Sequence, residues 1–395
     1  MTTKLFPTYE VGSLPKLPAR VKALRGESVT EMDILELKKL GETYSVDMEE
    51  IIGILEKQQN GKYKISLEER KRILDINALL NTRIQEKSRL NFVYDGEAKR
   101  SEMYRHVAEQ IEGFEDLPEM IRSRGPDSWR ASVCVAPPSM KSVDTVILNE
   151  FLYVQEHAHH VVKIPIDDPY MIAVMSDNRY YTELLCQKYE DEPRTLRYEA
   201  KRALTLALAE QVIRPQVEAV IKHGAQWIQL DIPAATIDIE HIPIVVEGIN
   251  KVVEGITGVK FSLHMCYPRR KSLCAKSGYE LLFPHLEQLA PTVNHLSLEL
   301  ANGDQYEKDL APFAQSDRKF EIGVGVIDIT LERQQKGLME TVPLVRERIL
   351  HAAEILGDPK LVYVAPDCGL RQLSLERCIN IYDIMVAGAE LARKG

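Results

Sequence analysis

The sequence lacks long hydrophobic runs and an excess of basic residues, and each absence excludes a class of protein. None of its apolar runs approaches the roughly 20 residues that a membrane-spanning helix requires. Its 50 basic residues are outnumbered by 59 acidic residues, which gives a net charge of -9, and no basic stripe occurs that would neutralise a phosphate backbone. We therefore expect neither a membrane nor a nucleic acid as a partner.

Cysteine is also scarce. The chain has 6 cysteines in 395 residues, and their uneven spacing does not form a disulfide framework. The first seven residues, Met-Thr-Thr-Lys-Leu-Phe-Pro, lack the apolar segment of a signal peptide, so we expect a cytoplasmic protein. In a reducing compartment some of these cysteines should be free thiols, and others can bind metal.

The apolar residues that are present make up 45% of the chain, which suffices for a large packed core. Short β-branched runs recur, each followed by a longer helical pattern, as in βα units around a parallel sheet. Continuous apolar runs such as 161–166 favour strands that are buried on both faces. We predict one α/β domain, residues 1–395, folded as a (β/α)8 TIM barrel with strands at 9–15, 92–96, 161–166, 227–232, 259–266, 295–300, 322–326 and 361–366.

Two stretches depart from this alternation. The stretch between the first two predicted strands carries helical patterns at 30–57 and 66–88, the second of which opens with the capping box Ser66-Leu-Glu-Glu69. We therefore expect an extended helical excursion there. A strand-like run at 129–136 lies outside the eightfold pattern, and we predict that it belongs to a hairpin covering one end of the barrel.

Active sites of such barrels form at the C-terminal ends of the strands. The fifth predicted strand ends in His264-Met265-Cys266, and alternate strand residues share a face, so His264 and Cys266 can point to one site. Glu299 and Cys368 end neighbouring strands and would complete a donor set suited to tetrahedral zinc. Since a cysteine at a strand end is often a small buried hydrophobe, spacing alone leaves both interpretations open.

Other strand ends carry Ser13, Glu97 and Asp231. Two carboxylates in one barrel mouth can act as general acid and base, pair with Arg or Lys, or clamp the ammonium group of a substrate. For each residue taken singly, a structural role is the alternative.

Seven segments together resemble, in the same order, the motifs of the C-terminal catalytic barrel of cobalamin-independent methionine synthase. The resemblance runs from Tyr9 to near the C-terminus. The segments are Val-Gly-Ser-Leu-Pro at 11–15, Asp-Gly-Glu at 95–97, Trp-Ile-Gln-Leu-Asp-Ile-Pro-Ala at 227–234, His-Met-Cys-Tyr at 264–267, Leu-Glu at 298–299, Gly-Val-Gly-Val-Ile-Asp-Ile at 323–329 and Ala-Pro-Asp-Cys-Gly-Leu at 365–370.

The resemblance implies a zinc-dependent methyltransferase that methylates the thiol of homocysteine to form methionine. Coordination to zinc would deprotonate that thiol and make it a nucleophile. The family's four zinc-ligand positions correspond to His264, Cys266, Glu299 and Cys368.

The family's positions for the amino-acid end of homocysteine fall on Ser13, Glu97 and Asp231. There Glu97 and Asp231, the two expected catalytic residues, would pair with the substrate ammonium group. Ser13 or nearby backbone amides would bind its carboxylate.

Two departures from the family pattern bear on the methyl donor. Full-length members carry two barrels, the first of which helps to bind a polyglutamylated methyl-folate, and this chain has room for one. Thr330 also stands where the family has a His that is thought to assist protonation of the folate leaving group, and Ile232 replaces the Glu of its Asp-Glu-Pro-Ala motif. Because the departing cobalt(I) form of a methyl-corrinoid needs no proton, we predict methylcobalamin or a corrinoid protein as donor, the latter also as a partner.

Three other enzymatic functions and one nonenzymatic role remain alternatives. A methyl-folate could be the donor to homocysteine, or the chain could transfer an alkyl or epoxide group to another thiol such as coenzyme M, although that sulfonate has no ammonium group for Glu97 and Asp231. A uroporphyrinogen-decarboxylase-like barrel would share the fold without zinc and use cations such as Arg269 and Arg270. An accessory protein would bind zinc or a corrinoid without turnover.

Overall fold

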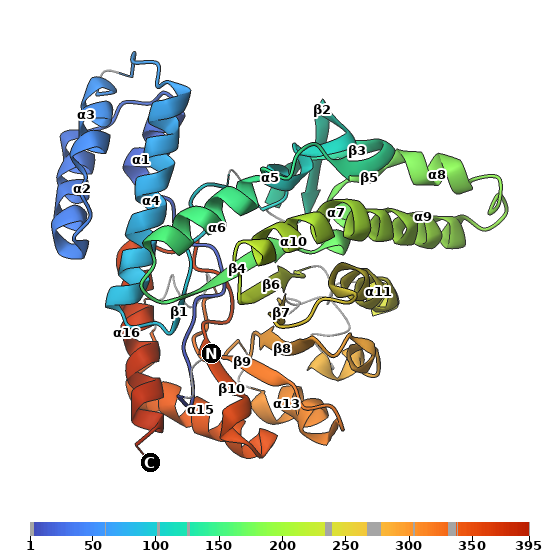
Figure 1. Ribbon diagram of the computed structural model, residues 1–395. Coiled ribbons are helices and arrows are strands. Elements are labelled where there is room, and N and C mark those ends of the chain that lie inside the picture. The colour runs from blue at the N-terminus through green and yellow to red at the C-terminus, as the bar shows by residue number, and fades with distance from the viewer. Residues whose placement is uncertain are drawn as a thin grey trace.

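The computed structural model describes residues 4–59, 61–100, 103–124, 127–233, 239–266, 278–302, 305–330, 337 and 339–394. Within these ranges the centre of the molecule is a curled, seven-stranded sheet in the order β1-β4-β6-β7-β8-β9-β10, with every neighbouring pair parallel (Figure 1). Its strands are β1 (Phe92–Val93), β4 (Val161–Asp167), β6 (Trp227–Asp231), β7 (Lys260–Met265), β8 (Val293–Leu298), β9 (Glu321–Gly325) and β10 (Val362–Ala365). Seven of the eight predicted strands are thus present.

In place of the first predicted strand, 9–15, the described residues show two isolated bridges at its start, one of them from the preceding Thr8. Thr8 pairs with Val364 of β10, and Tyr9 pairs with Phe92 of β1, both in parallel. Because β1 and β10 are the two edges of the sheet, the bridges place this segment between them. The prediction of a regular strand here is wrong, since the chain beyond Tyr9 has no ladder partner and turns into the loop that contains Gly12 and Pro15.

Helices cover the outer face of the sheet, as expected for βα units (Figure 1). Their apolar sides pack on the strands and form one large core. They are α6 (Val146–His157), α7 (Pro169–Met175), α9 (Pro193–Leu208), α10 (Arg214–Lys222), α11 (Ile242–Val253), α13 (Tyr306–Gln315), α15 (Val342–Leu356) and α16 (Leu375–Ala392).

The inner face of the sheet changes from aromatic to polar along the strands. Tyr9, Phe92 and Trp227 pack inside it, with ring centroids 5.2 Å apart for Tyr9–Trp227 and 4.5 Å for Phe92–Trp227. Residues two apart on a strand share a face, so Gln229 and then Asp231 follow Trp227 toward the C-terminal ends. The aromatic layer therefore forms the floor of a polar mouth.

The expected helical excursion between the first two strand segments is present. Two of its helices begin with capping boxes, in which Thr30 and Ser66 bond to the backbone N–H groups of Asp33 and Glu69. The four helices are α1 (Pro18–Leu24), α2 (Glu31–Tyr44), α3 (Glu49–Lys57) and α4 (Leu67–Lys87).

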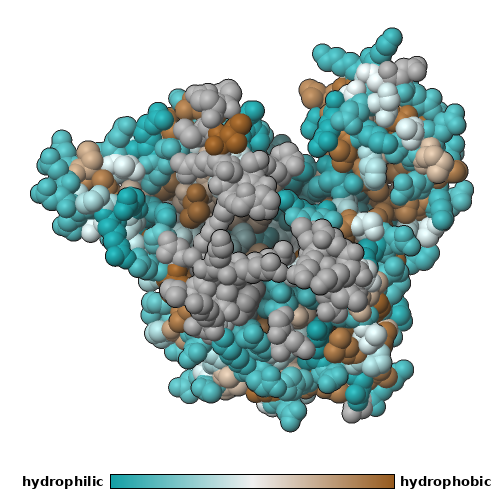
Figure 2. Space-filling model, turned by 180° about the vertical axis from the view of Figure 1, so that it is seen from behind, coloured by the Kyte–Doolittle hydropathy of each residue, from teal (hydrophilic) through white to brown (hydrophobic). Residues whose placement is uncertain are grey.

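A long hairpin contains the strand-like run predicted at 129–136. Its strands β2 (Ile111–Arg124) and β3 (Asp127–Met140) are antiparallel, and β3 also pairs in parallel with β5 (Asp177–Asn178). Figure 1 shows this hairpin with α8 (Arg179–Leu185) and α9 on the side of the molecule away from α1 to α4. The coloured surface in Figure 2 is mostly hydrophilic, with apolar residues in small separate patches.

The remaining described elements are short connectors. They are α5 (Arg105–Ala108), η1 (Ala209–Ile213), η2 (Ile239–His241), η3 (Gly278–Leu282), η4 (His285–Gln288) and η5 (Pro359–Leu361). Across the described ranges, no helix combines the length and the apolar character needed to cross a membrane.

Candidate active site

The four predicted metal ligands come together at the C-terminal end of the sheet. His264 lies in β7 and Cys266 just beyond it, Glu299 follows β8, and Cys368 follows β10. One donor atom from each of the four lies within 4.8 Å of the other three.

The spacing of three of these donor atoms fits a zinc ion. His264 Nε2 lies 3.4 Å from Cys368 Sγ and 3.5 Å from Cys266 Sγ, and the two sulfur atoms are 3.6 Å apart. Zinc bonds of about 2.3 Å to sulfur and about 2.0–2.1 Å to nitrogen place tetrahedral neighbours about 3.6 Å apart for S–N and about 3.8 Å for S–S. The triangle therefore has the size of one face of a zinc tetrahedron, and the Glu299 carboxylate is the candidate for the fourth corner.

Buried hydrogen bonds join the segments that carry these ligands. The Tyr279 hydroxyl accepts a bond of 3.1 Å from the Glu299 N–H and donates one of 3.2 Å to the Met265 carbonyl. The Asp367 carboxylate, next to Cys368, accepts bonds of 3.0 and 2.9 Å from the N–H groups of residues 300 and 301. The loops after β7, β8 and β10 are thus held to one another before any ion binds.

The two thiols differ in acidity because of their mutual contact. A hydrogen bond from the Cys266 thiol and the nearby His264 ring lower the pKa of Cys368 well below its ordinary value, against the opposing effect of burial. A thiol of this kind ionises readily, which favours metal binding.

A pocket of about 300 Å³ opens beside the metal ligands, and six of the seven predicted site residues line it. They are Ser13, Glu97, Asp231, His264, Cys266 and Cys368. Two glycines allow the close packing around this pocket. A Cβ atom on Gly12 would lie 3.0 Å from Glu97 Oε1, and one on Gly369 would lie 2.4 Å from Ser13 Oγ, so larger residues would displace these two side chains.

An unusual backbone turn presents Glu97 to the pocket. Gly96 and Glu97 have φ angles of 68° and 57°, in the left-handed region, which is uncommon for a residue with a side chain such as Glu97. The Asp95 carboxylate accepts a 2.7 Å bond from the Glu97 N–H, and the Leu14 N–H donates a 3.0 Å bond to the Gly96 carbonyl. Strain of this kind is often found at functional sites.

Arg100, which was not predicted from the sequence, lies behind Glu97. Its side chain is 2% exposed and lies 3.3 Å from Glu97 Oε1 and 3.0 Å from Glu150 Oε2. It also donates a 2.6 Å bond to the Pro165 carbonyl. Burial by itself lowers the pKa of Arg100, but the two carboxylates outweigh this effect and raise it well above its ordinary value. The i,i+3 spacing from Glu97 is the signal that could have indicated the pair.

The Asp231 carboxylate is buried, and its pKa differs from that of an exposed carboxylate. Burial raises its pKa to about 6, although His264 and Lys163 act in the opposite direction.

Arg371 and Met103 also line the pocket and were not predicted, and Arg371 is the one arginine or lysine among the described lining residues.

Thr330 lies next to the pocket-lining Ile329, and its N–H donates a 2.8 Å bond to the Asp328 carboxylate. Tyr267 and Ala234 of the motifs, and Arg269 and Arg270 of the decarboxylase alternative, lie outside the described residues.

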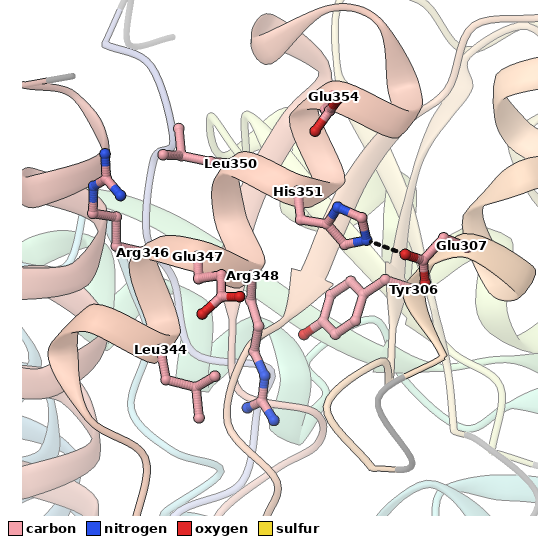
Figure 3. Close-up of a pocket in the computed structure, with 9 residues that line it drawn as sticks. All are labelled: Tyr306, Glu307, Leu344, Arg346, Glu347, Arg348, Leu350, His351 and Glu354. Atoms are coloured by element: carbon pink, nitrogen blue, oxygen red, sulfur yellow. Dashed lines mark hydrogen bonds and ion pairs between the residues drawn. The ribbon is translucent and has the colours of Figure 1, made fainter.

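A second pocket, of about 500 Å³, lies on the outer surface between α13 and α15 (Figure 3). Its polar side chains carry both signs of charge, and His351 lies 2.7 Å from Glu307. No residue predicted from the sequence lines this pocket. The candidate chemistry is therefore concentrated at the mouth of the sheet.

Comparison with known proteins defines the class. Residues 53–391 match the family described as the catalytic domain of cobalamin-independent synthase, and the chain belongs to this family. It is a methyltransferase, as the sequence analysis predicted.

Individual relatives agree with the family match. The methionine synthase of Pyrococcus furiosus is 30% identical over 304 residues, which are 76% of this chain and 78% of the relative. That of Pyrococcus horikoshii is 31% identical over 313 residues, 79% and 80% of the two chains. The structure of a B12-independent methionine synthase from a Shewanella species, in complex with selenomethionine, has a similar fold with a TM-score of 0.71 at 19% identity, covering 99% of this chain and 98% of that one.

The family match overturns one prediction. We expected a methyl-corrinoid donor, methylcobalamin or a corrinoid protein, and the family is cobalamin-independent. The expectation relied on the single barrel and on Thr330. Relatives of about this length carry the name methionine synthase, so the length of the chain does not indicate a corrinoid donor.

Proposed function

We propose that the chain transfers a methyl group to the thiol of homocysteine, producing methionine, and that the metal centre holds zinc. One observation carries the proposal: the triangle of His264, Cys266 and Cys368 opens onto the same pocket as Glu97 and Asp231. Homocysteine has a thiol at one end and an ammonium and a carboxylate group at the other. Its chemistry matches the soft donors and the charged groups that line this one pocket.

Each residue then has a role. His264, Cys266, Glu299 and Cys368 would hold the metal, which when bound lowers the pKa of a coordinated thiol and leaves a nucleophilic thiolate. Glu97 and Asp231 bind the substrate ammonium group as charge-assisted partners.

Ser13 and the neighbouring amides bind the substrate carboxylate, and Arg371 adds a positive charge at the rim. The substrate sulfur attacks the methyl carbon, and the bond from that carbon to the donor breaks as the S–C bond forms.

As methyl donor we propose a methyl-folate. The cobalamin-independent family supports it over the corrinoid that the sequence suggested. The nitrogen that loses the methyl group takes up a proton as it departs, and the Thr330 side chain is a poor acid. A group other than Thr330 therefore supplies this proton.

We further propose that the sheet closes into an eight-stranded barrel forming one domain, residues 1–395. The bridges from Thr8 and Tyr9 to the two edge strands support this arrangement. The cytoplasmic location stays a prediction.

The experiment combines metal analysis with a donor screen. We expect about one zinc per chain, which the decarboxylase alternative would not bind. A zinc-binding accessory protein would keep the metal but form no methionine. Zinc-loaded protein is incubated with homocysteine and methyl-folate bearing one or several glutamates, and methionine is measured by mass spectrometry. Methylcobalamin replaces the folate in a parallel arm, where we expect no product, and coenzyme M replaces homocysteine in another. A zinc-loaded protein that forms no methionine from any methyl-folate, or that prefers coenzyme M, would overturn the proposal.

A further inference from the structure

Beneath the pocket, a fully buried chain of hydrogen bonds leads to Asp231. Lys163 on β4 and Gln229 on β6 lie on the inner face of the sheet and are 1% and 0% exposed. Lys163 Nζ donates a 2.7 Å bond to Gln229 Oε1. Gln229 Nε2 in turn donates a 2.7 Å bond to Asp231 Oδ1. A cation, an amide and a carboxylate thus follow one another toward the pocket.

The chemistry of these groups gives the chain a direction. A glutamine amide has one end that accepts and one that donates hydrogen bonds, whereas an ammonium group only donates. Lys163 therefore requires the oxygen end of Gln229 and turns the NH2 end toward Asp231. The Asp231 carboxylate and the Val11 carbonyl, which only accept, require the NH2 end, so the groups at both ends of the amide select the same orientation.

The same donors also hold the first chain segment. Lys163 Nζ and Gln229 Nε2 each donate a 2.7 Å bond to the Val11 carbonyl. Val11 directly precedes Gly12 and Ser13, which line the pocket. The network therefore joins the Ser13 segment to the Asp231 carboxylate, the two places proposed to receive the carboxylate and the ammonium group of the substrate.

We propose that Gln229 and Lys163 are positioning residues that orient the Asp231 carboxylate and thereby make the enzyme select thiols that carry an α-amino group. Neither side chain lines the pocket, so both act through Asp231. The inference rests on the proposed function, because it assigns the substrate ammonium group to Asp231. A purely structural role would stabilise the fold without distinguishing one thiol from another.

The test compares two thiols. Homocysteine and 4-mercaptobutanoate differ only in the α-amino group, so their ratio of kcat/KM isolates its contribution. Two variants are made: Gln229→Met, which removes both ends of the amide, and Gln229→Glu, which keeps an acceptor for Lys163 and loses the donor to Asp231. Because Gln229→Glu can still pair with the buried lysine, it is the variant expected to keep the fold if Gln229→Met does not.

For both variants we expect kcat/KM for homocysteine to fall about 10- to 100-fold, the range for losing a hydrogen bond to a charged group. The fall should appear mainly in the KM for homocysteine, with zinc content and the KM for the methyl donor retained. Activity with 4-mercaptobutanoate should change little. Lys163→Met should lower the ratio of kcat/KM for homocysteine to that for 4-mercaptobutanoate, because Gln229 Oε1 then loses its donor and the amide is held at one end only.

The matched control is Gln216→Met. Gln216 is also a buried glutamine, 2% exposed, but it lies on the outer helix α10, where its amide bonds to the Val212 carbonyl. We expect the ratio of its kcat/KM values for the two thiols to equal that of the wild type.

Two results would overturn the inference. If zinc-loaded Gln229 variants lose activity equally with both thiols, the network is structural only. If the wild-type enzyme itself does not prefer homocysteine over 4-mercaptobutanoate, the assignment of the ammonium group fails, and the proposed function fails with it.

Discussion

Removing the buried cation Arg100 should destabilise the fold strongly. In Arg100→Met the new side chain keeps most of the aliphatic stem but leaves Glu97 and the fully buried Glu150 without their ion-pair partner. Breaking a buried ion pair by removing one partner costs about 3–5 kcal/mol, because the remaining charge is buried and uncompensated. Tyr94 still donates a 2.9 Å hydrogen bond to Glu150, which places the expected loss toward the lower end of this range.

The assay is calorimetric unfolding of the wild type and the variant under identical conditions. With an unfolding entropy of about 2.1 cal/mol/K per residue, the chain of 395 residues gains about 0.8 kcal/mol/K on unfolding. A loss of about 3–4 kcal/mol therefore corresponds to a Tm lower by about 4–5 °C. Adding Glu150→Gln should restore part of the loss, because it neutralises the orphaned charge.

The control is Arg194→Met, which removes an ion pair with Glu240 whose side chains are 78% and 66% exposed and should change stability by less than about 1 kcal/mol. If Arg100→Met lowers Tm no more than this control does, the assignment of Arg100 as the essential counter-charge is refuted.

Three further predictions concern the metal, the pH dependence and the donor. Cys368→Ser should lose most of the bound zinc as measured by atomic emission, whereas Cys134→Ser, at a buried thiol outside the ligand group, should retain it. Burial raises the pKa of Glu10 from 4.5 to about 8, so the folded state keeps a proton that the unfolded state loses, and stability should fall as pH rises through this range. Glu10→Gln should flatten the profile of Tm against pH, and an unchanged profile would contradict the assignment. Thr330→His should raise kcat with methyl-folate, by as much as 100-fold if protonation limits the rate, and Thr330→Gln should not.

Much of the fold could be predicted from the sequence because buried parallel strands have a simple pattern. The runs at 161–166 and 227–232 became β4 and β6 with boundaries within one residue. The run at 9–15 has the same local pattern, but a strand also needs a ladder partner, and the bridges at Thr8 and Tyr9 depend on how the edges of the sheet meet. That arrangement is set by tertiary packing and not by local sequence.

The metal-ligand part of the site could be predicted because its residues lie at the ends of strands, where local periodicity sets which side chains face the same way. His264 and Cys266 share a face by strand periodicity, and parallel strands bring Cys368 to the same end of the sheet. Arg100 was missed because a charged residue beside a turn is usually solvated, and Lys163 because a charged residue in an apolar strand looks like an exception to the pattern. Their roles depend on buried partners from distant segments, such as Glu150 and Gln229, which periodicity does not identify.

The donor was predicted wrongly because the lack of a second barrel and of a His at position 330 was interpreted as evidence for a different donor. The groups proposed to activate the thiol and to bind the amino-acid end of the substrate all lie at the end of one sheet. Relatives of comparable length, such as the methionine synthase of Pyrococcus furiosus, are similar to this chain over most of its length. The residues around this mouth, beginning with Thr330, are where the identity of the donor has to be tested.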